Sequence, residues 1–205
     1  MMLALDVDGV LLDPDRGGNG HWTNELTARF GITRDEFRHA FFVRVWDDVV
    51  NGRRPIEPAV ADALGTIGST ATVEEVLACW FEADFVPIEE VVAFARRVSA
   101  AGMRVVLATN QEHRRAAFLA ERLGELMTID AIVYSAQIGA QKHEAKFFHV
   151  ASERLEVVLD RRSDVVFVDD LIDNVRLANA SGWTAILADA GRSWIGEAGL
   201  VLGLD

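Results

Sequence analysis

The sequence predicts an α/β fold in which an open, doubly wound parallel sheet carries an inserted all-helical subdomain. Three observations predict it: five short apolar runs, amphipathic helical stretches between the later runs, and a long segment without strands after the first run. Short, nearly continuous aliphatic runs are typical of parallel strands covered on both faces. Their alternation with helices indicates βαβ units and a Rossmann-like sheet.

The predicted strands are the five apolar runs. They lie at residues Met2–Val7, Arg104–Ala108, Ala131–Tyr134, Val165–Val168 and Thr184–Leu187. Four helices are predicted with them, over Ile88–Ala100, Gln111–Leu123, Glu144–Leu159 and Ile172–Ala180. A proline precedes the first of these helices and a glycine follows three of them, which is the usual chemistry of helix starts and stops.

The stretch between the first two strands has helical signals and no convincing strand. Thr33 with Glu36, and Thr72 with Glu75, have the spacing of a capping box, and aromatic residues are frequent around them. A crossover of about seventy residues is far longer than a βαβ connection needs. The stretch is therefore predicted to be a separate helical unit.

This interpretation divides the chain into two parts. We expect an α/β core made of residues 1–13 and 87–205, and a helical cap over residues 14–86. The glycine-rich stretch Arg16–Gly20 is one expected hinge, and the region around Pro87 is the other.

Composition restricts the partners and the compartment. The formal net charge of −12 disfavours nucleic acid and anionic membranes as partners, and it means that an anionic substrate needs a metal ion or a local cation. Cys79 is the only cysteine, so no internal disulfide can form. We see no secretory signal and no apolar run of transmembrane length, so we expect a cytoplasmic protein.

Reactive side chains stand at the carboxyl ends of the predicted strands, where open parallel sheets bind their ligands. Asp6 and Asp8 end the first strand two residues apart, so in extended backbone they lean to the same face. Gly9 then allows a sharp turn. The later strand ends and loops add a hydroxyl, a lysine and further acids, at Thr109-Asn110, Lys142 and Asp169-Asp170.

Carboxylates gathered at one edge repel each other, and a divalent cation relieves that repulsion. Mg²⁺ prefers oxygen ligands and also accepts a phosphate oxygen. Phosphoryl transfer needs mainly positioning and charge neutralisation, which a metal and a cationic side chain supply together. Lys142 and Lys146 are the only lysines, and both lie close to a predicted strand end. The set indicates magnesium-assisted phosphate chemistry.

In their order along the chain, these motifs resemble those of the haloacid dehalogenase superfamily of phosphatases, in the branch with a helical cap after the first motif. The four similar stretches are 6–10 (DVDGV), 108–110 (ATN), 135–148 (SAQIGAQKHEAKFF) and 167–170 (FVDD) with Asn174 and Gly182. In the third stretch Phe148 lies six positions after Lys142, which favours Lys142 over Lys146 as the family lysine. His143 stands where the family usually has a proline that shapes the loop.

The resemblance implies a role for each residue. Asp6 is the expected covalent nucleophile and Asp8 the expected general acid/base. Phosphoryl oxygens are expected to bind Thr109, Asn110 and Lys142. The expected Mg²⁺ ligands are Asp6, the backbone carbonyl of Asp8, Asp170 and, directly or through water, Asp169.

The expected reaction is hydrolysis of a small phosphorylated metabolite through an aspartyl-phosphate, and several alternatives stay open. Dehalogenases that the chain resembles lack an acid at the position of Asp8, because halide leaves without a proton. A phosphomutase uses the same residues as a phosphatase. A receiver-type signalling module has similar residue types in another order and lacks the insert. A silent protein that binds a phosphorylated ligand is a further alternative.

Substrate selection is expected to depend on the cap and on the loops facing it. The candidates are polar and aromatic residues of both parts: His21, Trp22, Arg44, Trp46, Arg53 and Arg54 from the cap, and Gln111, His113 and Arg114 from the core. The competing interpretation is that the tryptophans belong to the cap core and that the arginines are solvated.

Overall fold

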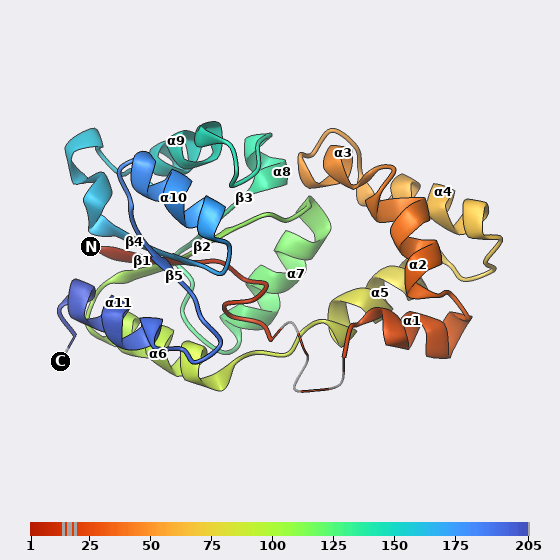
Figure 1. Ribbon diagram of the computed structural model, residues 1–205, viewed down its shortest axis with the longest axis horizontal. Helices are drawn as coiled ribbons and strands as arrows, with labels where there is room; N and C mark the ends of the chain where they lie inside the picture. The colour runs from red at the N-terminus through yellow and green to blue at the C-terminus, as the bar shows by residue number, and fades with distance from the viewer. Residues whose placement is uncertain (14, 16–17, 19, 205) are drawn as a thin grey trace.

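The computed structural model describes residues 1–13, 15, 18 and 20–204, and its centre is a parallel sheet of five strands in the order β3-β2-β1-β4-β5 (Figure 1). The strands are β1 (Met2–Leu5), β2 (Arg104–Thr109), β3 (Ala131–Tyr134), β4 (Val165–Asp169) and β5 (Thr184–Leu187). All four pairings are parallel, with Leu5 opposite Leu107 on one side and Val168 on the other. The order reverses at β1, which places Asp6 at the switch point where open α/β sheets bind ligands.

Helices cover both faces of the sheet, so the predicted doubly wound α/β fold is confirmed. One face is covered by α6 (Glu89–Ala100), α7 (His113–Gly124) and α11 (Trp194–Leu202), and the other by α8 (Ser135–Ile138), α9 (Ala145–Arg154) and α10 (Ile172–Ala180). Alternate residues of each strand point to opposite layers: Leu3 and Leu5 join the first apolar cluster, and Ala4 joins the second.

A helical insert, residues 21–86, follows the first strand and packs around its own apolar cluster (Figure 1). Its elements are α1 (Thr23–Phe30), α2 (Arg34–Phe37), a π-helical turn η2 (Arg38–Phe42), α3 (Trp46–Val50), α4 (Ile56–Ile67) and α5 (Val73–Ala83). Both predicted capping boxes form: Thr33 and Thr72 cap α2 and α5, with Glu36 and Glu75 closing the reciprocal bonds.

The two chain crossings between the sheet and the insert lie side by side. Asp13 N donates to Val86 O at 2.9 Å, and Ile88 N donates to Leu11 O at 2.8 Å. The expected hinge at Arg16–Gly20 falls largely on residues outside those that the structure describes. The expected hinge near Pro87 lies in this paired segment.

Some helix predictions were wrong in extent. The helix predicted over Glu144–Leu159 ends at Arg154, because Leu155 caps it and Glu156 adopts a φ of 60°, which turns the chain. A short 3₁₀ helix, η3 (Leu159–Asp164), then leads into β4. The helix expected from Gln111 begins at His113, since Glu112 caps it by accepting two backbone N–H groups. Helices α8 and α11 were not predicted.

None of the helices in the described part of the chain has the length and apolarity needed to cross a bilayer.

Candidate active site

Asp6, Lys142 and Asp169 form a buried ionic cluster at the carboxyl end of the sheet. The Lys142 ammonium lies 2.5 Å from Asp6 Oδ2 and 2.6 Å from Asp169 Oδ2. Asp6 directly follows β1 and Asp169 ends β4, the neighbouring strand, so the parallel pairing brings them together. The other oxygen of Asp6 accepts the Val7 N–H at 2.8 Å, which orients the carboxylate.

The loop after α8 delivers Lys142 to this cluster. Its backbone N–H donates to Asn110 Oδ1 at 2.9 Å, so the residue after β2 anchors the loop. His143, in place of the usual proline, is exposed and leaves the Lys142 ammonium at the two carboxylates. The Lys146 ammonium instead donates to Gly139 O on the surface. Only 2% of Lys142 is exposed, so its charge is offset by carboxylates rather than by solvent.

Asp169 is completely buried, and each of its two oxygens accepts hydrogen bonds. Besides Lys142, it accepts the Leu171 N–H at 2.8 Å and the side-chain amide of Asn174 at 3.0 Å and 3.2 Å. Asn174 lies in the first turn of α10, the helix that follows β4. Three donor groups, through four contacts, make Asp169 a rigid part of the site.

Asp6, Asp169 and Asp170 can each offer a carboxylate oxygen within 4.8 Å of the others, a group that could hold a metal ion. Oxygen-only carboxylate sets suit a hard cation such as Mg²⁺. Gly9 makes room for this group: its φ is +84°, and a Cβ there would collide with the Asp170 carboxylate.

The charges of this cluster shift its protonation. Burial raises the pKa of Asp6 to about 7, although Lys142 acts in the opposite direction. The pKa of Asp170 is also raised, first by burial and then by the neighbouring Asp169. Burial alone lowers the pKa of Lys142, but Asp6 and Asp169 outweigh it and raise that pKa above its usual value. The carboxylates of the cluster therefore repel one another, and a bound cation would reduce this repulsion.

The Asp8 carboxylate is bound by residues at the start of α7 rather than by the acidic group of Asp6, Asp169 and Asp170. Gln111 Nε2 donates to Asp8 Oδ2 at 2.7 Å, and Arg115 Nη2 lies 2.8 Å from Asp8 Oδ1. The Asp8 side chain stays 48% exposed, so it is accessible from the site. Gln111 was expected as a substrate contact, and here it contacts Asp8.

A hollow of about 170 Å³ opens beside Asp8, between the sheet edge and the helical insert. Two of the expected specificity residues, His21 and Trp22, line it together with Asp8, Asp13 and Asp84. Trp22 also belongs to the apolar cluster of the insert, where only 5% of it is exposed.

Thr109 is buried at the end of β2, the neighbour of β1 in the sheet.

The other expected specificity residues lie elsewhere. Arg44 and Arg54 line a separate hollow of the insert, and Trp46 packs against its aromatic cluster. Arg53 pairs with Asp47 and Asp48.

The two other substrate candidates from the core, Arg114 and His113, contact protein groups instead. Arg114 pairs with Glu57 and Glu74, and so docks the insert on α7. His113 Nδ1 lies 3.2 Å from the Tyr134 hydroxyl.

Two residues at the site were missed from the sequence. Arg115 and Asp84 meet at 2.9 Å beside Asp8, although they lie far apart in the sequence. Neither residue stands out in the sequence, because Arg115 lies in a run of polar residues at the start of α7 and Asp84 lies at the end of α5. Charge pairing between distant segments leaves no local sequence signal.

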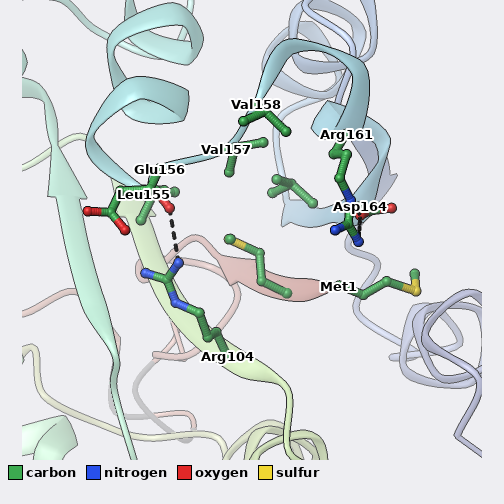
Figure 2. Close-up of a pocket in the computed structure, with 10 residues that line it drawn as sticks. Met1, Arg104, Leu155, Glu156, Val157, Val158, Arg161 and Asp164 are labelled. Atoms are coloured by element: carbon green, nitrogen blue, oxygen red, sulfur yellow. Dashed lines mark hydrogen bonds and ion pairs between the residues drawn. The ribbon is translucent and has the colours of Figure 1, made fainter.

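A second hollow, of about 230 Å³, lies at the opposite end of the sheet, where the strands begin (Figure 2). Its charged groups bond to their own neighbours: Arg104 donates to Leu155 O at 3.0 Å, and Arg161 pairs with Asp164 at 2.6 Å. None of the residues that line it belongs to the cluster around Asp6.

Several solved structures have this fold. A haloacid dehalogenase (HAD) family enzyme from Bacteroides thetaiotaomicron, in complex with magnesium and inorganic phosphate, is 16% identical, with a TM-score of 0.73 over 94% of this chain and 96% of that one. A HAD phosphatase from Thermococcus onnurineus is 20% identical, with a TM-score of 0.65 over 98% and 97%. A dehalogenase is 13% identical, with a TM-score of 0.66 over 100% and 97%.

A family model described as haloacid dehalogenase-like hydrolase matches residues 1–182, which include all four motifs at the sheet edge. The chain belongs to the haloacid dehalogenase-like hydrolase family.

Proposed function

We propose that the protein is a magnesium-dependent phosphatase that hydrolyses a small phosphomonoester through an aspartyl-phosphate on Asp6. One observation carries the proposal. A buried carboxylate, Asp6, lies 2.5 Å from a buried ammonium, Lys142, in a group with two further carboxylates, while Asp8 stands two residues away and half exposed. This is one nucleophile, one proton-transfer group and a place for positive charge.

Asp6 is the attacking group in the first step. One of its oxygens forms a bond to phosphorus as the ester P–O bond breaks, and the bonding electrons leave with the ester oxygen. Asp8 gives its proton to that oxygen, so the product is a neutral alcohol. In the second step Asp8 takes a proton from water, whose oxygen attacks phosphorus and frees Asp6.

Lys142 and Thr109 hold the phosphoryl oxygens during both steps. The Lys142 ammonium is fixed by its two carboxylate partners and by the Asn110 contact to its backbone, so it needs little reorganisation. The Thr109 hydroxyl lies on the strand beside β1, and the role assigned to it is a hydrogen bond to a phosphoryl oxygen. We assign Asn110 to the same phosphate-binding edge.

Asp6, Asp169 and Asp170, with the Asp8 backbone carbonyl, are the proposed ligands for Mg²⁺. All of them offer oxygen, the three carboxylates have oxygens within 4.8 Å of one another, and the pKa values of Asp6 and Asp170 are raised, which fits a hard divalent cation. When bound, such an ion neutralises negative charge on the carboxylates and the phosphate. Magnesium and phosphate in the structurally similar enzyme from Bacteroides thetaiotaomicron support this choice.

We further propose that the helical insert acts as the cap of a core formed by residues 1–13 and 87–205. The hollow beside Asp8, with His21 and Trp22 on its insert side, is the proposed place for the leaving group. Its volume of about 170 Å³ suits a small phosphorylated metabolite as substrate.

The test is hydrolysis of generic aryl phosphates and a panel of phosphorylated metabolites, with Mg²⁺ and with EDTA. We expect turnover with Mg²⁺ only. Asp6→Asn keeps the shape of the side chain but weakens the nucleophile, so we expect a loss of more than about a thousandfold in kcat, with unchanged circular dichroism. Full activity of Asp6→Asn, or turnover in EDTA, would refute the proposal.

The same assay separates the alternatives. A dehalogenase would release halide from haloacids and would not need Asp8, whereas the phosphatase needs Asp8 for its leaving alcohol. A phosphomutase would convert one sugar phosphate to its isomer without releasing phosphate. Release of inorganic phosphate, measured beside halide and isomer, therefore decides among these reactions.

A further inference from the structure

Arg115 joins the Asp8 carboxylate to the end of the helical insert. It lies in the first turn of α7, and only 5% of its side chain is exposed. Its Nη2 lies 2.8 Å from Asp8 Oδ1 and 2.9 Å from Asp84 Oδ2. Asp84 caps the carboxyl end of α5, where the chain leaves the insert and returns to the sheet.

The two donors on Asp8 fix its orientation without covering it. Arg115 engages one carboxylate oxygen and Gln111 the other, at 2.7 Å. A carboxylate has about four lone-pair sites, so one donor on each oxygen leaves others open. The side chain remains 48% exposed, and it lines the hollow shared with His21 and Trp22. The plane of the carboxylate is thus set while its free edge faces the site.

One aromatic ring of the insert, that of Trp80, lies against the same guanidinium. The Arg115 Cζ lies 5.8 Å from the centre of the Trp80 ring, and Trp80 is one helical turn before Asp84. Trp80 in turn stacks on Trp22, with ring centres 4.7 Å apart and planes at 10°. A planar guanidinium can stack and donate at once, which a lysine ammonium does less well.

We propose that Arg115 is a positioning residue: it aims Asp8 at the ester oxygen of the leaving group and makes that aim depend on the docked insert. The inference rests on the proposed function and deepens it. Asp8 must point along the bond on which it transfers its proton, and small misalignments cost large factors in rate. Arg115 touches neither the phosphoryl group nor the nucleophile, so it acts through Asp8.

This role has a signature that a structural role lacks. Proton donation matters most for esters with a poor leaving group and least for those whose leaving group departs as a stable anion. The experiment therefore measures kcat/KM on a series of aryl phosphates, from 2,4-dinitrophenyl phosphate to phenyl phosphate. The variants are Arg115→Met, Arg115→Lys and Arg115→Met/Asp84→Asn. The double variant also neutralises Asp84, which keeps the test meaningful if Arg115→Met alone folds poorly.

We expect Arg115→Met to lose about 10- to 100-fold on phenyl phosphate, the size of one charged hydrogen bond, and less than about threefold on the dinitrophenyl ester. The double variant should show the same contrast, and Arg115→Lys a smaller one. In an Asp8→Asn background, Arg115→Met should cost less than about threefold further, since the group it positions is gone.

Arg122→Met is the matched control. Arg122 lies two turns further along α7 and also bridges to the insert, through Glu82 at 2.7 Å and the Phe85 ring at 4.9 Å, away from Asp8. It should affect all esters equally. An equal loss across the series for Arg115→Met, or its full loss in the Asp8→Asn background, would overturn the inference while the phosphatase proposal stands. A wild-type protein inactive on every ester would overturn both.

Discussion

The two ends of the candidate site are built differently. Asp6, Lys142 and Asp169 form one end, with at most 5% exposure each, and all three come from strand ends or loops of the α/β core. Asp8 forms the other end: it is half exposed, and Arg115 connects it to Asp84 of the helical insert. The rigid edge of the sheet thus carries the charge cluster, whereas the position of Asp8, the proposed leaving-group end, depends on packing between two parts of the chain.

This contrast has a physical reason. Neighbouring parallel strands end at the same edge of the sheet. The residues at their ends therefore lie close together, independently of the structure around them. The insert is held on the core by scattered contacts. The Ser135 hydroxyl donates to Val50 O at 2.6 Å, and Gln141 donates to Asp47 Oδ1 at 3.0 Å. Changes at the first end should therefore act on the proposed nucleophile and metal site, and changes at the second end on the proposed proton transfer and on docking of the insert.

Among the changes that compare the two ends of the site, the largest effect should come from the lysine of the buried cluster. Lys142→Met removes the charge between Asp6 and Asp169, and we expect kcat/KM to fall by about a thousandfold. Stability without metal should fall by about 3–5 kcal/mol, because two buried carboxylates lose their partner. The measurements are steady-state kinetics and urea unfolding. Lys146→Met, the exposed lysine, is the control, and a similar loss in that variant would contradict the prediction.

The next effect concerns the turn that admits Asp170. Gly9→Ala adds a Cβ that collides with the Asp170 carboxylate and strains a φ of +84°, so we expect weaker Mg²⁺ binding and a roughly 10- to 100-fold activity loss. Titration of activity with Mg²⁺ measures both. Gly102→Ala has a similar φ, +79°, with open space around it, and should cost stability alone. Equal Mg²⁺ affinities in the two variants would speak against the role of this turn.

A pH effect on stability should follow from the raised pKa of Asp6. A carboxyl with a pKa of about 7 when folded and about 4 when unfolded binds its proton more tightly in the native state. Its contribution is therefore most favourable below about pH 4 and is lost as the pH rises toward 7, by up to about 1.4 kcal/mol per pH unit.

Urea unfolding without metal, compared between wild type and Asp6→Asn, isolates this term from other carboxyl groups. The stability of wild type relative to the variant should decline between about pH 4 and pH 7, and Mg²⁺ should reduce the decline. A difference that stays flat with pH would show that Asp6 is not perturbed.

The smallest effect should come from the docking end. Gly52 has a φ of +70°, and a Cβ there would collide with the Ala136 carbonyl of α8. Gly52→Ala should raise KM several-fold and cost about 1–3 kcal/mol, with kcat nearly unchanged. Gly68→Ala, with a φ of +74° and no neighbour in reach, gives the cost of the backbone strain alone. Equal KM values for the two variants would show that the contact between Gly52 and Ala136 does not affect substrate binding.

Much of the fold could be predicted because its signals are local. The five strands lie where the apolar runs predict them, with ends differing by at most two residues, as Met2–Leu5 against Met2–Val7 shows. The capping boxes at Thr33 and Thr72 were equally readable, since each closes over four residues. The end of α9 was not, because apolar residues continue to Leu159 after the helix stops at Arg154.

The sequence by itself determined the α/β class, the family motifs and the gathering of Asp6, Thr109, Lys142 and Asp169-Asp170 at one sheet edge. Strand periodicity and motif order suffice for that. Only the tertiary structure decided that Gln111 and Arg115 hold Asp8, that Arg114 docks the insert, and that His21 and Trp22, rather than Arg44 and Trp46, line the hollow beside Asp8. These residues lie 13 to 107 positions apart along the chain, and such pairings arise from how the helices pack, which leaves no pattern along the chain.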